Sequence, residues 1–223
     1  MLGTSPFIGA AQFGAKALEY KRLFFDTPEN MTKLFVHSAK LGINAVQLIA
    51  YEPLIKALKK AEALVGDFFV VATIVEDFVS DISMISSLEP EFIAPHAQFC
   101  DMLDPRLEEW IDAIKEIGAK PAASTHIPGT SIPKLDKLGF EAYLTPLNPL
   151  GYGMKPDFES TLEAIRNTKK SIIAIKPLAA GKLVPDTSLF KFIFEYADSI
   201  AVGAVSENEM AETYSQALLN PSV

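Results

Sequence analysis

The fold prediction rests first on residues 43–54, "INAVQLIAYEPL". The stretch begins as an apolar run and does not alternate apolar with polar residues, as a strand with one solvated face would. Runs of this kind are typical of parallel strands that are covered on both faces. The stretch also presents Gln47 and Tyr51 before Pro53, so polar groups gather near its carboxyl end.

Seven further apolar runs lie along the chain: "FIGAAQF", "DFFVVATIV", "EFIAPHA", "KPAAST", "EAYLTPL", "SIIAIKPL" and "SIAVGAV". A helical pattern follows each run. Eight strand–helix units in 223 residues predict an α/β fold, a (β/α)8 TIM barrel that forms a single domain over residues 1–223. The alternative is an open doubly wound sheet, in which a glycine-rich dinucleotide turn more often follows the first strand, and "GAAQFG" matches that turn poorly.

Three helices are predicted from the residues at their ends. An N-cap, a proline in the first turn and a stopping glycine mark two of them, and a capping-box spacing marks the third. The residues are Thr27, Pro28 and Gly42 in the first helix, Asp104, Pro105 and Gly118 in the second, and Ser206 with Glu209 in the third.

Composition and charge exclude several classes of protein. The chain is 49% hydrophobic and 22% charged, as expected of a globular domain, and its net charge of −8 provides no basic surface for nucleic acid. Cys100 is the single cysteine, which favours a reducing cytoplasm. There is no apolar run of membrane-spanning length and no basic leader. We expect a small-molecule substrate, no nucleic acid and no membrane, and leave homo-oligomerisation open.

In a barrel of this kind the chemistry lies at the carboxyl ends of the strands. Lys176 follows "IIAI", where an unpaired buried charge is costly, so it is predicted to pair with a carboxylate or to act as a nucleophile with a lowered pKa. His37 lies inside the first predicted helix and is expected to be structural. The polar residues expected near the strand ends are Gln12, Gln47, Tyr51, Thr73, Glu76, Asp77, His96, Gln98, Asp101, Ser124, His126, Thr145, Asn148, Lys176 and Ser206.

The loops "PLAAGK" and "VGAVSENE" follow the last two predicted strands, where such barrels commonly bind phosphate. Gly181 permits close backbone approach, and Lys182 adds a positive charge. Glu207 and Glu209, in the first turn of the last helix, would repel a phosphate. Ordinary tight loops explain the two segments equally well.

Six stretches, in this order and spacing, resemble landmark stretches of the aldo-keto reductase family: "LGINAVQLIAY", "EFIAPHAQFCD", "LEEWIDAIKEIGAKPAASTH", "YLTPLNPLGYG", "IIAIKPLAAGKL" and "IAVGAVSENEMAET". The resemblance covers about residues 40 to 215. It implies a (β/α)8 barrel that binds a nicotinamide cofactor, NAD(P)H, and reduces carbonyl compounds. In that family a tyrosine gives a proton to the carbonyl oxygen as hydride arrives.

Carried over to this chain, the family's catalytic set is altered. His96 matches the family histidine and Tyr51 matches the tyrosine, whereas Gln47 and Ile74 stand where an aspartate and a lysine are expected. With Lys176, the predicted catalytic residues are Tyr51, His96, Lys176 and Gln47. The predicted cofactor-binding residues are Ser124, Asn148, Gly181, Lys182, Gly203 and Ser206. The last helix lacks the arginine that often holds the extra phosphate of NADP, which favours NADH over NADPH.

Three functions remain open on these grounds. The first is a nicotinamide-dependent reductase of a small carbonyl compound with an altered catalytic set. The second is a Schiff-base lyase or aldolase that uses Lys176, and the third is a catalytically inactive, ligand-binding barrel. A metal variant would use His96, His126 and either Glu76 or Asp77, but no compact metal-binding motif supports it. Residues 15–29 have the length and mixed character that a lid over the site needs.

Overall fold

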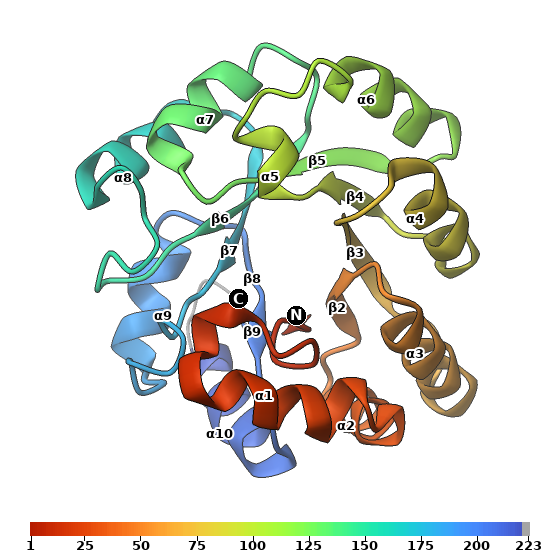
Figure 1. Cartoon of the computed structure of the whole chain (residues 1–223). Helices are drawn as coiled ribbons and strands as arrows, with labels where there is room; N and C mark the ends of the chain where they lie inside the picture. Colours follow the sequence, from red (N-terminus) through yellow and green to blue (C-terminus); the bar gives the residue numbers. More distant parts are fainter. Residues whose placement is uncertain (220–223) are drawn as a thin grey trace.

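Parallel strands form a ring at the centre of the molecule, and helices surround it (Figure 1). The computed structural model describes residues 1–219. Its strands, in the order β8-β7-β6-β5-β4-β3-β2-β1-β9, form a (β/α)8 TIM-barrel fold, which confirms the predicted fold class. The strands are β1 Leu2–Gly3, β2 Ala45–Ile49, β3 Phe69–Ile74, β4 Phe92–Pro95, β5 Lys120–Ser124, β6 Ala142–Pro146, β7 Ser171–Ile175, β8 Ser199–Ile200 and β9 Val202–Gly203.

The eighth position of the barrel is one strand interrupted at Ala201. Its first part, β8, pairs with β7, and its second part, β9, pairs with β1. The Ala201 amide donates to the Ala174 carbonyl at 2.8 Å, and the Val202 amide donates to the Met1 carbonyl at 3.1 Å. The two edge strands, β8 and β9, therefore belong to one continuous chain segment, which closes the ring between β7 and β1.

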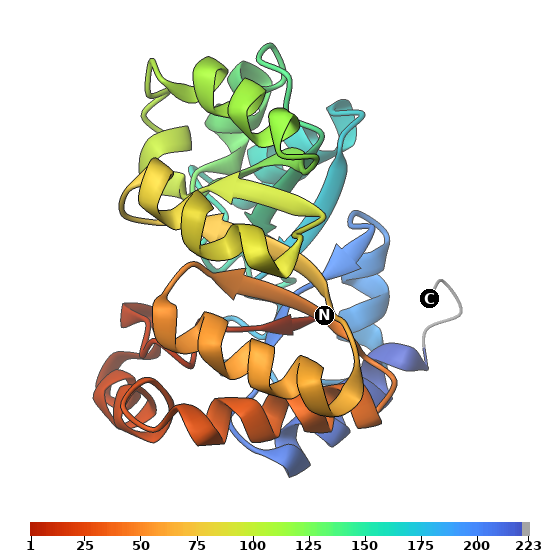
Figure 2. The ribbon, with the colours of Figure 1, turned by 90° about the vertical axis from the view of Figure 1, so that its right-hand side faces the viewer.

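Helices cover the outside of the ring, and α2 and α3 lie side by side there (Figure 2). The Thr32 hydroxyl on α2 donates to the Ala57 carbonyl on α3 at 3.2 Å. Within residues 1–219 no helix is both long enough and apolar enough to cross a bilayer. The helices are η1 Ala11–Lys16, α1 Ala17–Tyr20, η2 Lys21–Phe25, α2 Pro28–Lys40, α3 Glu52–Val65, α4 Phe78–Ile85, η3 Ser86–Leu88, α5 Ala97–Cys100, α6 Leu107–Glu116, α7 Pro128–Leu135, α8 Phe158–Asn167, α9 Thr187–Phe194 and α10 Glu207–Leu218.

Two of the three predicted helix starts are confirmed. Helix α2 begins at Pro28 after Thr27, and Gly42 follows it with a φ of +84°. Helix α10 begins after Ser206, whose hydroxyl accepts the Glu209 amide at 3.2 Å. The Glu209 carboxylate in turn accepts the Val205 amide at 3.2 Å, so both halves of a capping arrangement are present.

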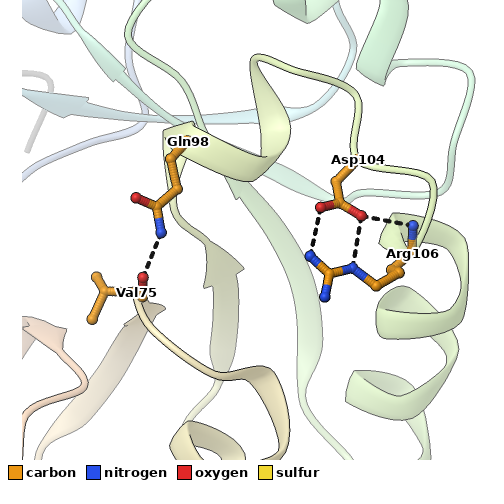
Figure 3. A network of polar contacts seen from close by, with 4 residues as sticks. All are labelled: Val75, Gln98, Asp104 and Arg106. Atoms are coloured by element: carbon orange, nitrogen blue, oxygen red, sulfur yellow. Dashed lines mark hydrogen bonds and ion pairs between the residues drawn. The ribbon is translucent and has the colours of Figure 1, made fainter.

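Helix α6 starts later than predicted. It begins at Leu107 rather than at Pro105, because Asp104 uses its carboxylate on Arg106 instead of on a helical first turn. The Arg106 backbone amide donates to Oδ1 at 3.0 Å, and its guanidinium makes two further bonds to the same carboxylate at 2.9 and 2.7 Å (Figure 3). This local fork holds residues 104–106 in a turn ahead of the helix.

The predicted first strand, "FIGAAQF", is wrong. The first strand is β1, and residues 7–13 form turns and the start of η1. The Phe7 amide donates to the Thr4 carbonyl at 2.9 Å, and the Gly9 amide donates to the Pro6 carbonyl at 3.0 Å. Gly9 has a φ of +62°, and a Cβ there would collide with the Ala17 carbonyl oxygen. The segment is apolar because Phe7 is buried against the helices, not because it pairs in the sheet.

Candidate active site

A cavity of about 470 Å³ opens at the carboxyl ends of the strands. Its size lies within the range of about 300–1,000 Å³ that is typical of small-molecule sites. Leu144 and Ala201 also belong to the apolar cluster inside the barrel, so they form part of the cavity floor. The polar side chains that line it are Ser5, Gln12, Lys16, Tyr20, Gln47, Thr73, His96, Ser124, His126, Lys176 and Glu209.

One wall of the cavity comes from the segment that follows β1. Gln12, Phe13 and Lys16 of η1 and Tyr20 of α1 line the cavity, and the rings of Phe13 and Tyr20 meet edge to face with centroids 5.3 Å apart. The early part of residues 15–29 therefore borders the site. Further along, Phe25 packs on Tyr51, and no residue from 21 to 29 is in the described lining, so the segment does not border the cavity along its whole length.

Two histidines stand together in the cavity. The rings of His96, after β4, and His126, after β5, meet edge to face with centroids 5.3 Å apart. His96 Nδ1 accepts the Gln98 amide at 3.3 Å, which assigns the ring proton to Nε2. Burial and the nearby Lys176 lower the pKa of His96, and burial, Lys176, His96 and Lys155 lower the pKa of His126 to about 3. Both imidazoles are therefore neutral near pH 7, and each has one donor and one acceptor nitrogen.

Lys176 reaches the same cavity from the end of β7. Its backbone has a φ of +55°, a left-handed conformation that a lysine rarely adopts and that is often found at functional sites. Burial and then the positive charge of Lys155 lower its pKa to about 8, and Asp101 opposes this shift. Within residues 1–219, Lys176 forms no ion pair. A cavity amine that loses its proton this readily can act as a nucleophile.

Asp101, after α5, fixes the loop that carries His126. Its carboxylate accepts the Thr125 hydroxyl, the Ser131 hydroxyl at 2.8 Å and the His126 backbone amide at 2.9 Å. Three charge-assisted bonds to one carboxylate hold the start of α7 against α5. Gln98 makes a similar link on the other side, where its amide donates to the Val75 carbonyl beyond β3 (Figure 3).

The predicted catalytic residues of β2 have different positions. Gln47 is buried in the cavity lining, and its amide donates to the Thr73 hydroxyl at 2.9 Å. Tyr51 is not among the described residues that line the cavity. The chain turns tightly at this point, with the Tyr51 amide on the Ile49 carbonyl at 2.7 Å, and the ring packs edge to face on Phe25 at 5.8 Å.

The surroundings of Tyr51 disfavour an acidic phenol. Burial and the carboxylates of Glu76 and Asp81 raise its pKa, and no lysine is among the groups that shift it. Neither Lys176 nor Lys182 therefore takes the place of the family's cation beside this tyrosine. A catalytic role for Tyr51 stays a prediction without support from the cavity geometry.

Three of the six predicted cofactor-binding residues line the cavity, namely Ser124, Gly181 and Gly203. The other three have structural partners. Asn148 donates to the carbonyls of Tyr152 and Lys176 at 2.9 and 3.1 Å and accepts the Tyr152 amide at 2.9 Å, so both of its N–H donors are used within the protein. Lys182 lies over the Tyr152 ring at 4.5 Å, and Ser206 caps α10.

The positions of the side chains also bear on two further predictions, the metal site and the structural role of His37. Within residues 1–219, no three His, Cys, Asp or Glu side chains gather as a metal site requires. Asp77 instead caps α4 by accepting the Ser80 amide at 2.9 Å. His37 lies on α2, outside the cavity, with Nδ1 3.6 Å from the Glu207 carboxylate, as expected of a structural residue.

Sequence reasoning did not single out Lys155 and Lys16. Lys155 lies in the loop between β6 and α8, and Lys16 closes η1. Both are exposed. Lys16 lies in the segment 15–29 considered as a lid, and Lys155 follows the stretch "YLTPLNPLGYG", but neither lysine itself belongs to a motif that marks a cavity residue.

These features define a (β/α)8 barrel with a polar, ligand-sized cavity at the carboxyl ends of its strands. Among solved structures it is similar to the holo form of aldo-keto reductase AKR11C1 from Bacillus halodurans, with a TM-score of 0.65 and 14% identity over 83% of this chain and 80% of that chain. An aldo/keto reductase from Brucella melitensis has a TM-score of 0.65 and 12% identity, over 84% of each chain.

Barrels with other activities are also similar. Phosphoribosyl anthranilate isomerase from Thermus thermophilus has a TM-score of 0.59 and 11% identity, over 85% of this chain and 94% of that chain. No protein-family model and no curated protein sequence matches this chain. At these identities the likeness shows the fold, and the site must be interpreted from its own residues.

Proposed function

We propose that this barrel is an enzyme that acts on a small carbonyl compound and that Lys176 attacks the carbonyl carbon. The observation that carries the proposal is a half-buried amine, unpaired within residues 1–219, that lines a ligand-sized cavity together with two neutral imidazoles. A lysine with an ordinary pKa is almost fully protonated at pH 7. A pKa of about 8 increases the neutral fraction roughly 10²-fold.

The proposed step is formation of a Schiff base. The lone pair of the neutral Lys176 amine adds to the carbonyl carbon, and the carbonyl oxygen takes up a proton. The carbinolamine then loses water, which carries away the carbonyl oxygen and two protons, and a carbon–nitrogen double bond remains. Once protonated, this imine withdraws electrons from the neighbouring carbon–carbon bond, as in lyases and aldolases.

His96 and His126 are the groups placed to move the protons of this step. Each neutral ring can donate from one nitrogen and accept at the other, so the carbonyl oxygen can receive a proton without a charged acid in the cavity. Asp101 is a positioning residue, because it holds the His126 backbone and does not itself line the cavity.

Borohydride trapping tests the proposal. The purified protein is incubated with small aldehydes and ketones, reduced, and analysed by mass spectrometry after digestion. We expect a stable adduct on Lys176, its loss in Lys176→Met, and its retention in Lys134→Met, which removes an exposed lysine of α7. No adduct with any carbonyl, or an adduct that persists in Lys176→Met, would overturn the proposal.

The second candidate is a nicotinamide-dependent reductase of a small carbonyl compound. It is supported by the likeness to solved aldo-keto reductases, one of them a holo form, and by the positions of Ser124, Gly181 and Gly203. The residues at the start of α10 do not fit a dinucleotide whose diphosphate would lie there. Glu209 lines the cavity at that point, and its carboxylate already accepts the Val205 amide.

Titration with NADH and NADPH, followed by nicotinamide fluorescence, tests this candidate. Micromolar binding of either would favour the reductase, and the absence of a 2′-phosphate arginine from α10 predicts tighter binding of NADH. No binding at millimolar concentration would exclude it. A barrel that only binds a ligand is the remaining possibility, and turnover of any carbonyl compound would exclude that reading.

A further inference from the structure

We propose that the carbonyl compound bound at Lys176 carries an anionic group, a carboxylate or a phosphate, that lies on the Lys155 side of the cavity. The inference rests on the proposed function, because it names the class of substrate for the same site. Its basis is the distribution of charge around the cavity.

The cavity holds more positive than negative charge. Lys16 and Lys176 line it, and Glu209 is the one acidic residue in its described lining. The Glu209 carboxylate is held by the Val205 amide at the start of α10. Within residues 1–219, neither lysine forms an ion pair. Asp101 also acts on Lys176 from outside the lining, but its carboxylate accepts hydrogen bonds from Thr125, Ser131 and the His126 amide. The positive charge that remains at the cavity, in a chain of net charge −8, attracts an anion.

The loop between β6 and α8 brings a further cation to this side. Gly153 of that loop passes so close to Lys176 that a Cβ on Gly153 would lie 3.3 Å from the lysine Cδ. Two residues on, the Lys155 carbonyl accepts the Gly129 amide at 3.0 Å, which ties the loop to the start of α7. These contacts place the backbone of Lys155 between Lys176 and the start of α7, just outside the described cavity lining. The charge of Lys155 lowers the pKa of both Lys176 and His126.

An anion on this side would complete the site. A half-buried ammonium without a counter-ion is costly, and the neutral imidazoles can donate hydrogen bonds but supply no charge. Lys155 is the exposed cation of the pair and is the one that faces the anion, while Lys176 loses its proton to react. The carbonyl carbon of the substrate therefore lies at Lys176, and its anionic group lies toward Lys155.

Trapping with matched carbonyl compounds tests the substrate class. Pyruvate and dihydroxyacetone phosphate provide the carboxylate and the phosphate, and hydroxyacetone is the neutral counterpart. At fixed pH we expect half-maximal adduct formation at about fivefold lower concentration for at least one anion than for hydroxyacetone. Whichever anion is preferred identifies the group.

The variant Lys155→Met should remove this preference, and Lys134→Met, with the same change in net charge, should keep it. The same Lys155→Met change removes a like charge beside Lys176, so the pH of half-maximal trapping should move above about 8. Equal trapping of neutral and anionic compounds by the unchanged protein would overturn the inference and leave the proposed function intact.

An equilibrium measurement separates the two proposals. The ring C–H signals of His96 and His126 are followed by NMR during titration with lactate and with inorganic phosphate, which cannot form an imine. Signal shifts that disappear in Lys155→Met, together with no borohydride adduct, would support the anion site while the Schiff-base function fails. Absence of shifts with both probes would overturn the anion site.

Discussion

The ends of β2 and β7 begin alike in sequence and diverge in space. Each is an apolar run that finishes near a polar side chain with reactive potential, Tyr51 in one and Lys176 in the other. Lys176 lines the cavity, whereas Tyr51 packs on Phe25 and is absent from the described lining. The position of a residue just past a strand is therefore set by the turn that follows the strand, not by the strand itself.

The physical difference lies in two backbone conformations. Lys176 takes a left-handed φ of +55° immediately after β7, which keeps its side chain over the barrel. Tyr51 has a φ of −115° and is the N-cap residue of α3. Its ring packs edge to face against the ring of Phe25. The backbone is strained at Lys176 and unstrained at Tyr51. Backbone strain of this kind is expected where a side chain must be held in place for function.

The largest expected effect comes from Lys176→Met. It should abolish the borohydride adduct and at the same time stabilise the fold near pH 7. A lowering of the pKa from 10.5 to about 8 reflects a cost of roughly 3 kcal/mol for keeping this lysine charged in the native state. Trapping and urea unfolding at pH 7 check both parts. Destabilisation together with a persistent adduct would break the contrast with Tyr51.

Asp101→Ala is expected to have the next largest effect. It removes the acceptor of three hydrogen bonds that hold the His126 loop, and we expect a loss of about 2–4 kcal/mol of unfolding free energy and slower trapping. Asp101→Asn keeps an acceptor but loses the charge that raises the pKa of Lys176, so its trapping profile should move toward lower pH. An unchanged profile in Asp101→Asn would argue for a purely structural role.

The reactivity of Lys176 in the unchanged protein should depend on pH. Trapping should rise with pH and level off above about 8, because the neutral amine of Lys176 is the reacting form. Between pH 8 and 10.5 the unfolded chain binds a proton there that the native state has lost, so this residue makes stability rise with pH. Denaturant unfolding across that window should show the slope in the unchanged protein and a smaller one in Lys176→Met.

The smallest effect is expected from Tyr51→Phe. The phenol lies beside Glu76 and Asp81 and outside the described cavity lining, so trapping should stay within about twofold of the unchanged protein and stability within about 0.5 kcal/mol. Trapping rates and the denaturation midpoint measure this. A large loss of activity toward carbonyl compounds would restore the family mechanism and reverse the contrast between β2 and β7.

The sequence predicted seven of the eight strand positions and the helices between them. These strands could be predicted because a parallel strand that is buried on both faces is apolar along its whole length. It also placed His96, Ser124 and Lys176 at strand ends, which is where they line the cavity. The missed strand is instructive. "FIGAAQF" has the composition of a strand, but the turns at Pro6 and Gly9 send Phe7 into the helical core instead.

The order of apolar runs and helical patterns along the chain was enough to predict the barrel, and the polar residues that follow those runs include His96, Ser124, His126 and Lys176 of the cavity lining. The tertiary structure decided which of those groups face one another. Tyr51 packs on Phe25 outside the described cavity lining, the Asn148 amide donates to the Lys176 carbonyl, and Gly153, in the loop that carries Lys155, passes beside the Lys176 side chain. Such contacts join residues far apart in the chain, and local pattern carries no record of them.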